Sequence, residues 1–362
     1  MKAIGYLQPQ AIEHKDALID IELPMPKAFG RDLLVKVQAV SVNPVDAKIR
    51  ASSAPNDGEH KILGWDAVGE VIATGDLAEF FNVGDQVWYA GDISRDGSNK
   101  EYQLVDERIT GIKPKSLSNA EAAAMPLTTI TAWELLFDRL DFTPLIPNGL
   151  NLTYSHNVNN KSAPNAQAID PAPPQPSILI IGAAGGVGSI LTQLAAKLTN
   201  ATVIGTASKP ESQAWVSELG ADHVINHHQP LLPQLQTIGL HSVTYVMSLT
   251  HTDQHFDQLV EVIAPQGKLA LIDSPTDIDI MKLKTKCISL HWEFMFTRAM
   301  FNTWDIQKQH ELLTTVSELI DSGLIKTTVG DSYGTINATN LKRAHTDIES
   351  NQTMGKIVLE GF

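Results

Sequence analysis

A glycine-rich turn between an apolar run and a helix-like segment is the feature that most restricts how this chain folds. Residues 178–181 are Ile-Leu-Ile-Ile, and they lead directly into the small residues of 182–188. Apolar side chains then recur at helical spacing, at Val187, Ile190, Leu191, Leu194, Ala195 and Leu198. A buried strand, a tight turn and a helix that packs back on the strand are typical of the first unit of a parallel sheet. The sequence therefore predicts that an α/β domain starts here.

The alternation of strand and helix continues along the chain. Strand-like runs lie at 202–206, 224–225, 243–247 and 268–272. A helix is expected at about 211–219, where Gly220 suits a left-handed C-terminal cap. Near-continuous apolar strands joined by helices predict a doubly wound parallel sheet of the Rossmann type, covered by helices on both faces.

The segments before and after this alternation have a different pattern of residues. Residues 1–130 hold short β-prone runs broken by Gly, Pro and Asp, and after about residue 285 the alternation stops. We expect a mainly β domain built from residues 1–130 and 285–362, with the Rossmann domain at 131–284. A polar segment rich in Pro and Asn, at about 145–176, is predicted to be an insertion or a long surface loop in the Rossmann domain.

Composition and charge exclude several classes of protein. The 362 residues are 43% hydrophobic and 19% charged, which is ordinary for a globular chain. The net charge is -14 and the basic residues are scattered, which argues against a nucleic-acid partner. Because no apolar run is long enough to cross a bilayer and no signal-like block follows Met1, we expect a cytoplasmic protein with no membrane partner. Cys287 is the single cysteine, which excludes a four-thiolate zinc site.

The glycine-rich turn is a candidate dinucleotide site. The strict G-x-G-x-x-G pattern is not met, because Ala183 stands where its first glycine would be. Small residues still let a pyrophosphate approach the backbone, and the helix N-terminus offers N–H groups to it. The cofactor-binding residues predicted here are Ala184, Gly185, Gly186, Val187 and Gly188. The alternative is a turn that is kept small only for tight packing.

The end of the second strand indicates which dinucleotide is bound. Sites that prefer NAD place Asp or Glu there to hold the ribose 2′-hydroxyl, whereas this chain has Ser208 and Lys209. A hydroxyl and an ammonium favour the 2′-phosphate of NADPH. Glu211 is near enough in sequence to keep NADH open, and Lys209 could also be a plain solvated lysine.

With these residues in hand, the sequence resembles the medium-chain dehydrogenase/reductase superfamily, in its zinc-free quinone oxidoreductase branch, which includes zinc-type alcohol dehydrogenase-like proteins. The resemblance covers nearly the whole chain. Its carriers are Asn43-Pro44-Val45-Asp46 and the segments 63–71, 83–87, 126–133, 183–188, 219–222 and 355–359. It implies a GroES-like, mainly β catalytic domain beside the Rossmann domain, with NADPH in a cleft between them. It also implies a homodimer, since dimers are common in this family.

The resemblance bears on a catalytic metal. Zinc alcohol dehydrogenases of the superfamily carry Cys in the segment that matches Asn43 to Asp46, a His-Glu pair at Trp65-Asp66 and a further Cys near Ala124. An amide and an indole are poor substitutes for these ligands, so we expect no zinc. The proton-relaying hydroxyl of those enzymes falls at Val45, which has none. His251 and His255 are four residues apart and could share a metal, but we interpret them, like His227 and His228, as surface histidines.

A reductase without a Lewis acid needs an acceptor that is already electrophilic, so the predicted small-molecule partner is a quinone or an α,β-unsaturated carbonyl (enone). The candidate catalytic residues are Asn43, as a hydrogen-bond donor to developing negative charge, and Asp46 and Asp66, as proton carriers. Each has a structural alternative. Asn43 could brace the backbone before Pro44, and the two carboxylates could tie loops together.

Further cofactor contacts are predicted by position. Thr128 and Thr131 match a segment that runs beside the nicotinamide in the family, although they could instead cap a helix. Leu249, Thr250, Ile272 and Asp273 follow two of the Rossmann strands at their carboxyl ends, where such sheets bind ligands. Trp65, Phe294 and Phe296 would shape an apolar acceptor pocket or belong to the core.

Three functions are consistent with these observations. The preferred one is an NADPH-dependent, metal-free oxidoreductase that reduces quinones or enones by hydride transfer. The second is a non-catalytic NADPH-binding sensor or scaffold. The third, a zinc-dependent alcohol dehydrogenase, is disfavoured by the missing ligands.

Overall fold

The computed structural model describes residues 1–146 and 175–362, so most of the predicted insertion at 145–176 lies outside the described residues. The chain divides into two compact units. We call Met1–Ile130 with Met295–Phe362 the β unit, and Thr131–Phe294 the Rossmann unit.

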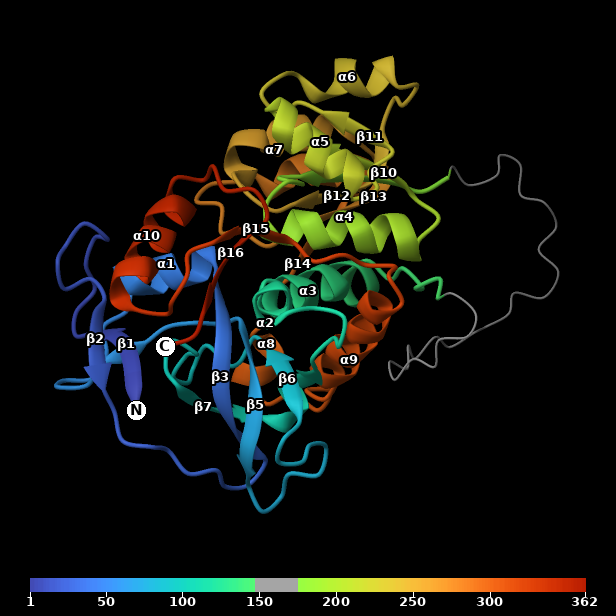
Figure 1. Cartoon of the computed structure of the whole chain (residues 1–362). Coiled ribbons are helices and arrows are strands. Elements are labelled where there is room, and N and C mark those ends of the chain that lie inside the picture. Colours follow the sequence, from blue (N-terminus) through green and yellow to red (C-terminus); the bar gives the residue numbers. More distant parts are fainter. Residues whose placement is uncertain (147–174) are drawn as a thin grey trace. The chain divides into compact units, whose positions relative to one another are not determined.

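The β unit is built on an antiparallel sheet with one parallel pair at its edge (Figure 1). Its strands run in the order β15 (Val329–Ser332), β16 (Lys356–Glu360), β3 (Asp32–Val42), β5 (Ala67–Thr74), β6 (Gln86–Tyr89) and β8 (Thr110–Ile112), with β7 (Tyr102–Asp106) also paired to β3. A smaller sheet has the order β2 (Ile19–Glu22), β1 (Lys2–Tyr6) and β4 (Lys61–Ile62). In the larger sheet Val358 of β16 lies opposite Ser41 of β3, so the last strand of the chain pairs with one from its first fifty residues.

Helices cover and connect these strands. The β unit contains α1 (Pro44–Ser52), η1 (Glu107–Ile109), α2 (Asn119–Ala123), α8 (Thr297–Met300), α9 (Lys308–Asp321) and α10 (Ala338–Glu349). Helix α1 packs against α10, and α9 packs against β8. Helix α3 (Pro126–Trp133) crosses the division between the units and continues as the π-helix η2 (Glu134–Arg139).

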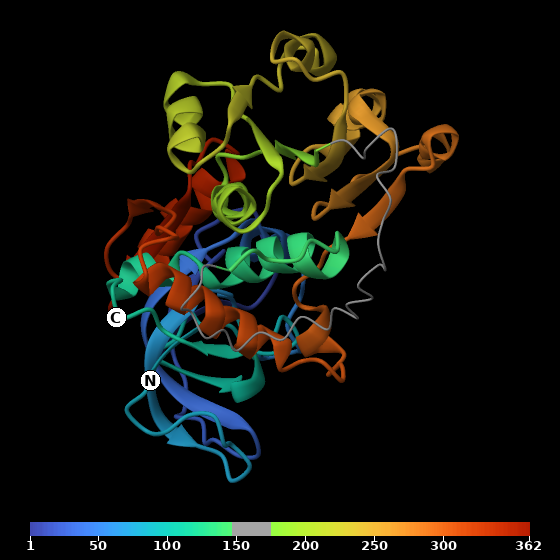
Figure 2. The same cartoon turned by 90° about the vertical axis from the view of Figure 1, so that its right-hand side faces the viewer.

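The Rossmann unit is a parallel sheet in the order β11 (His223–Ile225), β10 (Thr202–Thr206), β9 (Ser177–Ile181), β12 (Val243–Ser248), β13 (Ile263–Leu271) and β14 (Ser289–Trp292). The direction in which strands are added reverses between β9 and β12. Right-handed crossovers then place α4 (Gly186–Leu198) and α5 (Pro210–Glu218) on one face, and α6 (Leu231–Thr237) and α7 (Thr252–Val262) on the other (Figure 2). The predicted doubly wound sheet is confirmed.

The helix that follows the glycine turn illustrates how the pattern produces the packing. Its apolar positions Ile190, Leu191, Leu194, Ala195 and Leu198 are all fully buried, as their spacing predicts. Gly220 has a φ of +107°, which confirms the left-handed cap expected after α5. The opposite face of the sheet is buried by apolar residues of α6 and α7, such as Leu235 and Leu259.

One predicted boundary differs from the structure. The sheet continues past residue 285, because β14 pairs in parallel with β13, and the return to the β unit begins at Met295. The sequence of β14 hides it: Ser-Leu-His-Trp is an edge strand with exposed ends and lacks the apolar run of a central strand.

Candidate functional site

The glycine turn leaves β9 at the reversal point of the Rossmann sheet. Gly182 has a φ of +81°, which favours glycine, and its N–H donates to Thr206 Oγ1 at 3.0 Å. The turn closes through a hydrogen bond from Gly185 N to Gly182 O at 3.1 Å. The next such bond, from Ser189 N to Gly185 O, is the first of helix α4, so the amides of residues 186–188 are the ones that the helix itself leaves available.

Close approach explains the small residues of the turn. A Cβ on Gly188 would lie 2.3 Å from Gly182 O and 2.6 Å from the backbone of Ala183, so no side chain fits there. A Cβ on Gly185 would meet only Gly182 O, at 3.5 Å. Ala183 is buried, whereas residues 184–187 are half-buried and present their backbone at the carboxyl edge of the sheet. The predicted site residues thus form one continuous surface of small side chains.

The other strand ends lie at the same edge. Ser208 is half-buried and Lys209 is exposed, directly after β10. Leu249 and Thr250 follow β12 and are half-buried, and a Cβ on Gly182 would lie 3.0 Å from Thr250 Cγ2. The structure therefore brings Thr250 against the glycine turn, as expected for neighbouring strands at a reversal point.

Asp273 has a different role in the geometry. One of its carboxylate oxygens accepts from Thr252 N at 2.9 Å, and the other accepts from Thr252 Oγ1 at 2.6 Å. This carboxylate therefore holds the first turn of α7 next to the end of β13, and Ile272 beside it is half-buried. Its lone pairs are engaged by protein donors, which limits what Asp273 offers to a ligand.

The candidate catalytic residues of the β unit form a buried polar cluster. Asn43, Asp66 and Lys356 are each at most 2% exposed. Asn43 Nδ2 donates to Asp66 Oδ2 at 2.8 Å, and the Lys356 ammonium lies 3.1 Å from the same carboxylate. Lys356 Nζ also donates to Val42 O at 2.9 Å and to Asn43 Oδ1. Leu127 N donates to the other oxygen of Asp66 at 2.7 Å, which ties the start of α3 to this cluster.

Asp46 joins two loops instead of facing this cluster. It lies in the first turn of α1, where Oδ2 accepts from Asn43 N at 2.8 Å in a capping box. Its Oδ1 accepts from Gly64 N at 2.9 Å. Gly64 has a φ of +111° and no room for a side chain beside Ser98 and Asn99. Asp46 therefore fixes the segment that carries Trp65 and Asp66 relative to the end of β3.

Burial controls the protonation of both carboxylates. It raises the pKa of Asp46 to about 7, against the opposing effects of the Asn43 amide and the Lys356 ammonium, and the nearby Asp66 adds to the rise. Burial also raises the pKa of Asp66, although the Lys356 ammonium and the donors from Leu127 and Asn43 oppose that rise. The ion pair thus offsets only part of the cost of placing this charge in the interior.

Lys356 is the residue of this cluster to which the sequence reasoning assigned no role. It lies in an otherwise apolar final strand, Lys356-Ile357-Val358-Leu359, and is itself buried. A charged residue at the start of a strand with such a pattern is unusual. The position of this lysine in an apolar strand was the signal that could have predicted a buried partner of opposite charge.

The remaining predicted residues divide between buried and exposed positions. Thr128 and Thr131 lie three residues apart on α3 and are buried, and Thr128 Oγ1 donates to Met125 O at 3.0 Å. Trp65 is fully buried and packs edge-on against Phe296 at 6.1 Å. Its indole N–H donates to Asp92 O at 3.3 Å, so Trp65 belongs to the core. Phe294 is 47% exposed.

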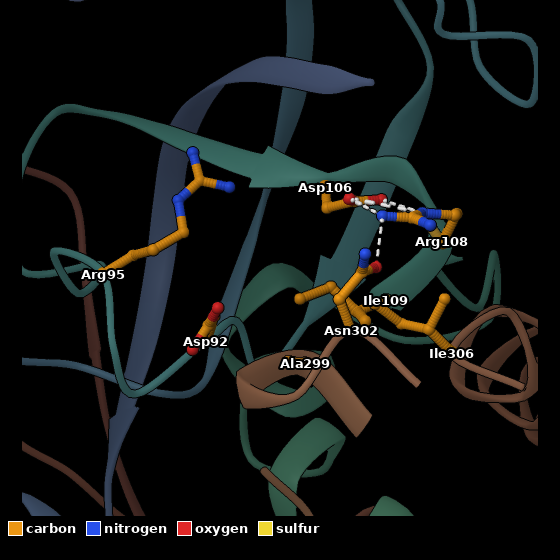
Figure 3. A pocket seen from close by; sticks show the side chains of 8 residues that line it. All are labelled: Asp92, Arg95, Asp106, Arg108, Ile109, Ala299, Asn302 and Ile306. Atoms are coloured by element: carbon orange, nitrogen blue, oxygen red, sulfur yellow. Dashed lines mark hydrogen bonds and ion pairs between the residues drawn. The ribbon is translucent and has the colours of Figure 1, made fainter. Parts of the chain in front are cut away.

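A small cavity of about 160 Å³ in the β unit is lined by charged, polar and apolar side chains, among them the ion-paired Arg108 and Asp106 (Figure 3). Arg95 donates two hydrogen bonds to Asp32, at 2.8 and 2.9 Å. Arg108 pairs with Asp106 and donates to Asn302 Oδ1 at 3.1 Å. The cavity is lined by Asp92, Arg95, Asp106, Arg108, Ile109, Ala299, Asn302 and Ile306. Its arginines are neutralised by neighbouring carboxylates, so it offers no net positive site to an anion.

Metal ligands and membrane spans can be examined only in the part of the chain that the structure describes. Within residues 1–146 and 175–362, no three His, Cys, Asp or Glu side chains are grouped so that they could hold a metal ion. In the same residues, no helix combines the length and the apolar character needed to cross a membrane.

Comparisons with known proteins agree with this geometry. Residues 30–131 match the alcohol dehydrogenase GroES-like domain, and residues 219–359 match the zinc-binding dehydrogenase family. A zinc-type alcohol dehydrogenase-like protein of Staphylococcus epidermidis is 35% identical over 362 residues, covering 99% of each chain. One from Staphylococcus aureus strain MRSA252 is 37% identical over 363 residues, again covering 99% of each chain.

Solved structures extend the likeness to the whole fold. A proposed zinc-dependent alcohol dehydrogenase from Rhizobium etli CFN 42 is 49% identical with a TM-score of 0.89, covering 100% of this chain and 98% of that one. The quinone oxidoreductase of Escherichia coli in complex with NADPH has a TM-score of 0.78 at 22% identity, covering 99% and 100%, which shows the fold alone.

The chain therefore belongs to the medium-chain dehydrogenase/reductase superfamily, with a GroES-like domain and a Rossmann domain. It is an oxidoreductase of that superfamily.

Proposed function

We propose that the chain is an NADPH-dependent, metal-free oxidoreductase that reduces quinones or α,β-unsaturated carbonyls by hydride transfer. The observation that carries this proposal is the buried cluster of Asn43, Asp66 and Lys356. In this cluster the cation bound by the carboxylate and by the amide oxygen is a lysine ammonium.

The residues of this cluster do not fit zinc. Structural and catalytic zinc sites use thiolate, imidazole and carboxylate ligands at about 2.0–2.3 Å. Asn43 offers only an amide, which is engaged by Asp66 and Lys356, and the Trp65 indole donates its N–H to a backbone carbonyl. A zinc ion near Asp66 would also meet the buried Lys356 ammonium. The relatives above carry zinc in their names, and it is this donor set that argues against zinc here.

The residues of the Rossmann unit fit NADPH. The amides of residues 186–188 would hold the pyrophosphate, since the strand-to-helix turn leaves them available. Ser208 and Lys209 would hold the 2′-phosphate, because β10 ends without a carboxylate that would repel it. Leu249, Thr250 and Ile272 would line the strand ends, with Asp273 holding α7 in place, and Thr128 and Thr131 on α3 would contact the nicotinamide end.

When bound, NADPH supplies a hydride to an electron-poor carbon of the acceptor. Asn43 has a second amide N–H beyond the one given to Asp66, and we assign it to the acceptor oxygen that gains negative charge. Asp66 and Lys356 position this amide, and Asp46 positions the loop that carries Asp66. Because Asn43 does not titrate, it donates at any pH at which the fold is intact.

The test is an acceptor screen with NADPH and NADH side by side. We expect oxidation of NADPH by members of a panel of quinones and enones, and slower oxidation of NADH. Absence of oxidation with every acceptor, despite NADPH binding, would identify a non-catalytic binding protein instead. In the same assay Lys209→Ala should raise the KM for NADPH and leave that for NADH unchanged. Lys197→Ala, at the exposed far end of α4, is the matched control.

A further inference from the structure

Histidines from two distant segments gather in one cluster of the Rossmann unit. The rings of His227 and His228 have centroids 4.4 Å apart, and those of His227 and His255 have centroids 6.0 Å apart. His251 belongs to the same group, because it also lowers the pKa of both His227 and His255 through its charge. These residues, which the sequence suggested are surface histidines, are exposed or half-buried, and they form an imidazole cluster, defined as His227, His228, His251 and His255.

Hydrogen bonds connect the neighbourhood of the cluster to two of the segments that we assign to the cofactor. Ala207 N donates to Ile225 O at 2.9 Å, so Ser208 and His227 each follow within two residues of this bond between the ends of β10 and β11. On the other side, His251 Nδ1 bonds Thr250 Oγ1 at 2.7 Å, and Thr250 touches the position of Gly182. His251 and His255 open helix α7 at the carboxyl end of β12.

The backbone at this point is held in an uncommon conformation. His251 has φ +50° and ψ +37°, in the left-handed region that side chains other than glycine seldom adopt. The hydrogen bond to Thr250 and the bond from Thr252 N to Asp273 hold it there. Residues kept in such conformations by their surroundings concentrate at binding sites.

Two of the imidazoles have a ring nitrogen without a hydrogen-bond partner among the described residues. Among the described residues, neither Nδ1 of His227 nor Nδ1 of His255 has a hydrogen-bond partner, although both atoms are shielded from solvent. Buried polar atoms of this kind are normally satisfied, so their state requires an explanation. A ligand that approaches from the strand ends would supply one.

Burial, and then the neighbouring charges, favour the neutral form of His227 and His255 in the free protein. Burial and the neighbouring His228, His255 and His251 lower the pKa of His227 to about 4. Burial, His251 and His228 also lower the pKa of His255, which Asp253 opposes. Helix α6, which follows β11, carries no charged side chain, and Asp273 is bonded to Thr252. A dianionic phosphate placed beside these rings would reverse the balance and favour their protonated form.

We propose that the imidazole cluster is a proton-coupled subsite for the 2′-phosphate of NADPH, so that binding of this cofactor takes up a proton that binding of NADH does not. This inference rests on the proposed function, since it presumes that the dinucleotide lies on the glycine turn. It assigns cofactor specificity to His227 and His255 in addition to Ser208 and Lys209. It predicts that the preference for NADPH over NADH weakens as the pH rises.

The test measures binding of NADPH and NADH by calorimetry in two buffers of different ionisation enthalpy, with a chelator present, from pH 6.5 to 8.5. In this range the phosphate itself is mostly dianionic, since its second pKa is about 6. We expect NADPH binding to take up close to one proton near pH 7 and its Kd to rise by up to about tenfold per pH unit. The Kd for NADH should stay constant.

Variants identify the acceptor of the proton. His227→Asn combined with His255→Gln should abolish the proton uptake and flatten the pH dependence for NADPH, with NADH binding unchanged. His241→Gln is the matched control, because His241 is exposed and precedes β12, at the opposite edge of the sheet.

The outcomes separate the inference from the proposed function. NADPH binding without proton uptake, or with uptake that survives in the double variant, overturns the inference and leaves the proposed function intact. Failure of NADPH to bind at any pH, while NADH binds, overturns both.

Discussion

The two sites of this molecule satisfy their polar groups in opposite ways. In the β unit, the oxygens of Asp46 and Asp66 and the Asn43 amide oxygen accept bonds from other protein groups, and the residues are buried. In the Rossmann unit, the amides at the start of α4 and the Nδ1 atoms of His227 and His255 have no partner within the part of the chain that the structure describes.

This difference indicates how each site works. A site whose polar groups are already paired is rigid before any ligand arrives, and it suits the orientation of one donor toward a reacting atom. A site whose donors and acceptors are unpaired gains most when a polar ligand supplies the partners. We therefore associate the first with positioning for the reaction and the second with recognition of the cofactor.

We expect the largest effect from a substitution that fills the glycine turn of the Rossmann unit with a side chain. Gly188→Val places carbon atoms where Gly182 O and the Ala183 backbone already lie, so the turn and the first turn of α4 must move apart. We expect a loss of unfolding free energy of more than about 3 kcal/mol and no measurable NADPH binding. Thermal denaturation by circular dichroism and a fluorescence titration with NADPH measure the two effects. Gly185→Ala, which meets only one atom at 3.5 Å, should fold normally, and equal damage from both variants would contradict this reading of the turn.

The next largest effect is expected when a buried charge in the polar cluster of the β unit loses its partner of opposite charge. Lys356→Met removes the ammonium beside Asp66 and should lower the unfolding free energy by about 3–5 kcal/mol at pH 8. The loss should be smaller at pH 5, because an Asp66 without Lys356 takes up a proton more readily. Urea denaturation at both pH values measures this. The double variant Lys356→Met with Asp66→Asn should recover much of the loss, and a double variant as unstable as the single one would count against the ion pair.

Protonation of Asp46 in the β unit should also make the free energy of unfolding depend on pH. The folded pKa of Asp46, about 7, lies above the unfolded value of 3.8, so the folded state binds the proton more tightly. The stabilisation is complete below pH 4 and is lost as the pH rises through about 7. Melting temperatures from pH 5.5 to 8.5 should fall more steeply for the native protein than for Asp46→Asn. The exposed Asp253→Asn serves as the control, and parallel curves for the native protein and Asp46→Asn would refute the shift.

The smallest effect tests an exception to the pairing of polar groups in the β unit. His345 on α10 is fully buried, neither ring nitrogen has a partner among the described residues, and burial lowers its pKa to about 3. Replacement by leucine removes two unpaired polar atoms at similar volume, so His345→Leu should raise the unfolding free energy by about 1 kcal/mol. His310, whose Nδ1 bonds Thr110 O at 2.7 Å, is the contrast, and His310→Leu should destabilise. A destabilised His345→Leu would show that its ring is satisfied in solution.

The glycine turn of the Rossmann unit, with its strand and its helix, was largely predictable from the sequence because the residues that form it are consecutive. The strand, the small residues of 182–188 and the helix are consecutive, so the period of the apolar residues and the close approach at Gly188 could be read together. Ser208 and Thr250 followed from the rule that parallel strands bind ligands at their carboxyl ends.

The paired site was predictable only in part, because its contacts are distant along the chain. Lys356 meets Asn43 across 313 residues, and no local pattern links the two. Similarly, His227 and His255 come together only because α6 returns the chain across the sheet, which spacing in the sequence does not reveal. Asp273 was predicted to contact cofactor, and its bonds to Thr252 depend on how α7 starts.

We propose above all that the oxidoreductase works with a lysine ammonium, and no metal, beside Asp66. The most direct test is the rate of NADPH oxidation with an active quinone or enone, measured before and after exhaustive dialysis against a zinc chelator, with zinc determined in the same samples. We predict an unchanged rate in protein with far less than one zinc per chain. A rate that disappears on chelation and returns with added zinc would contradict the account.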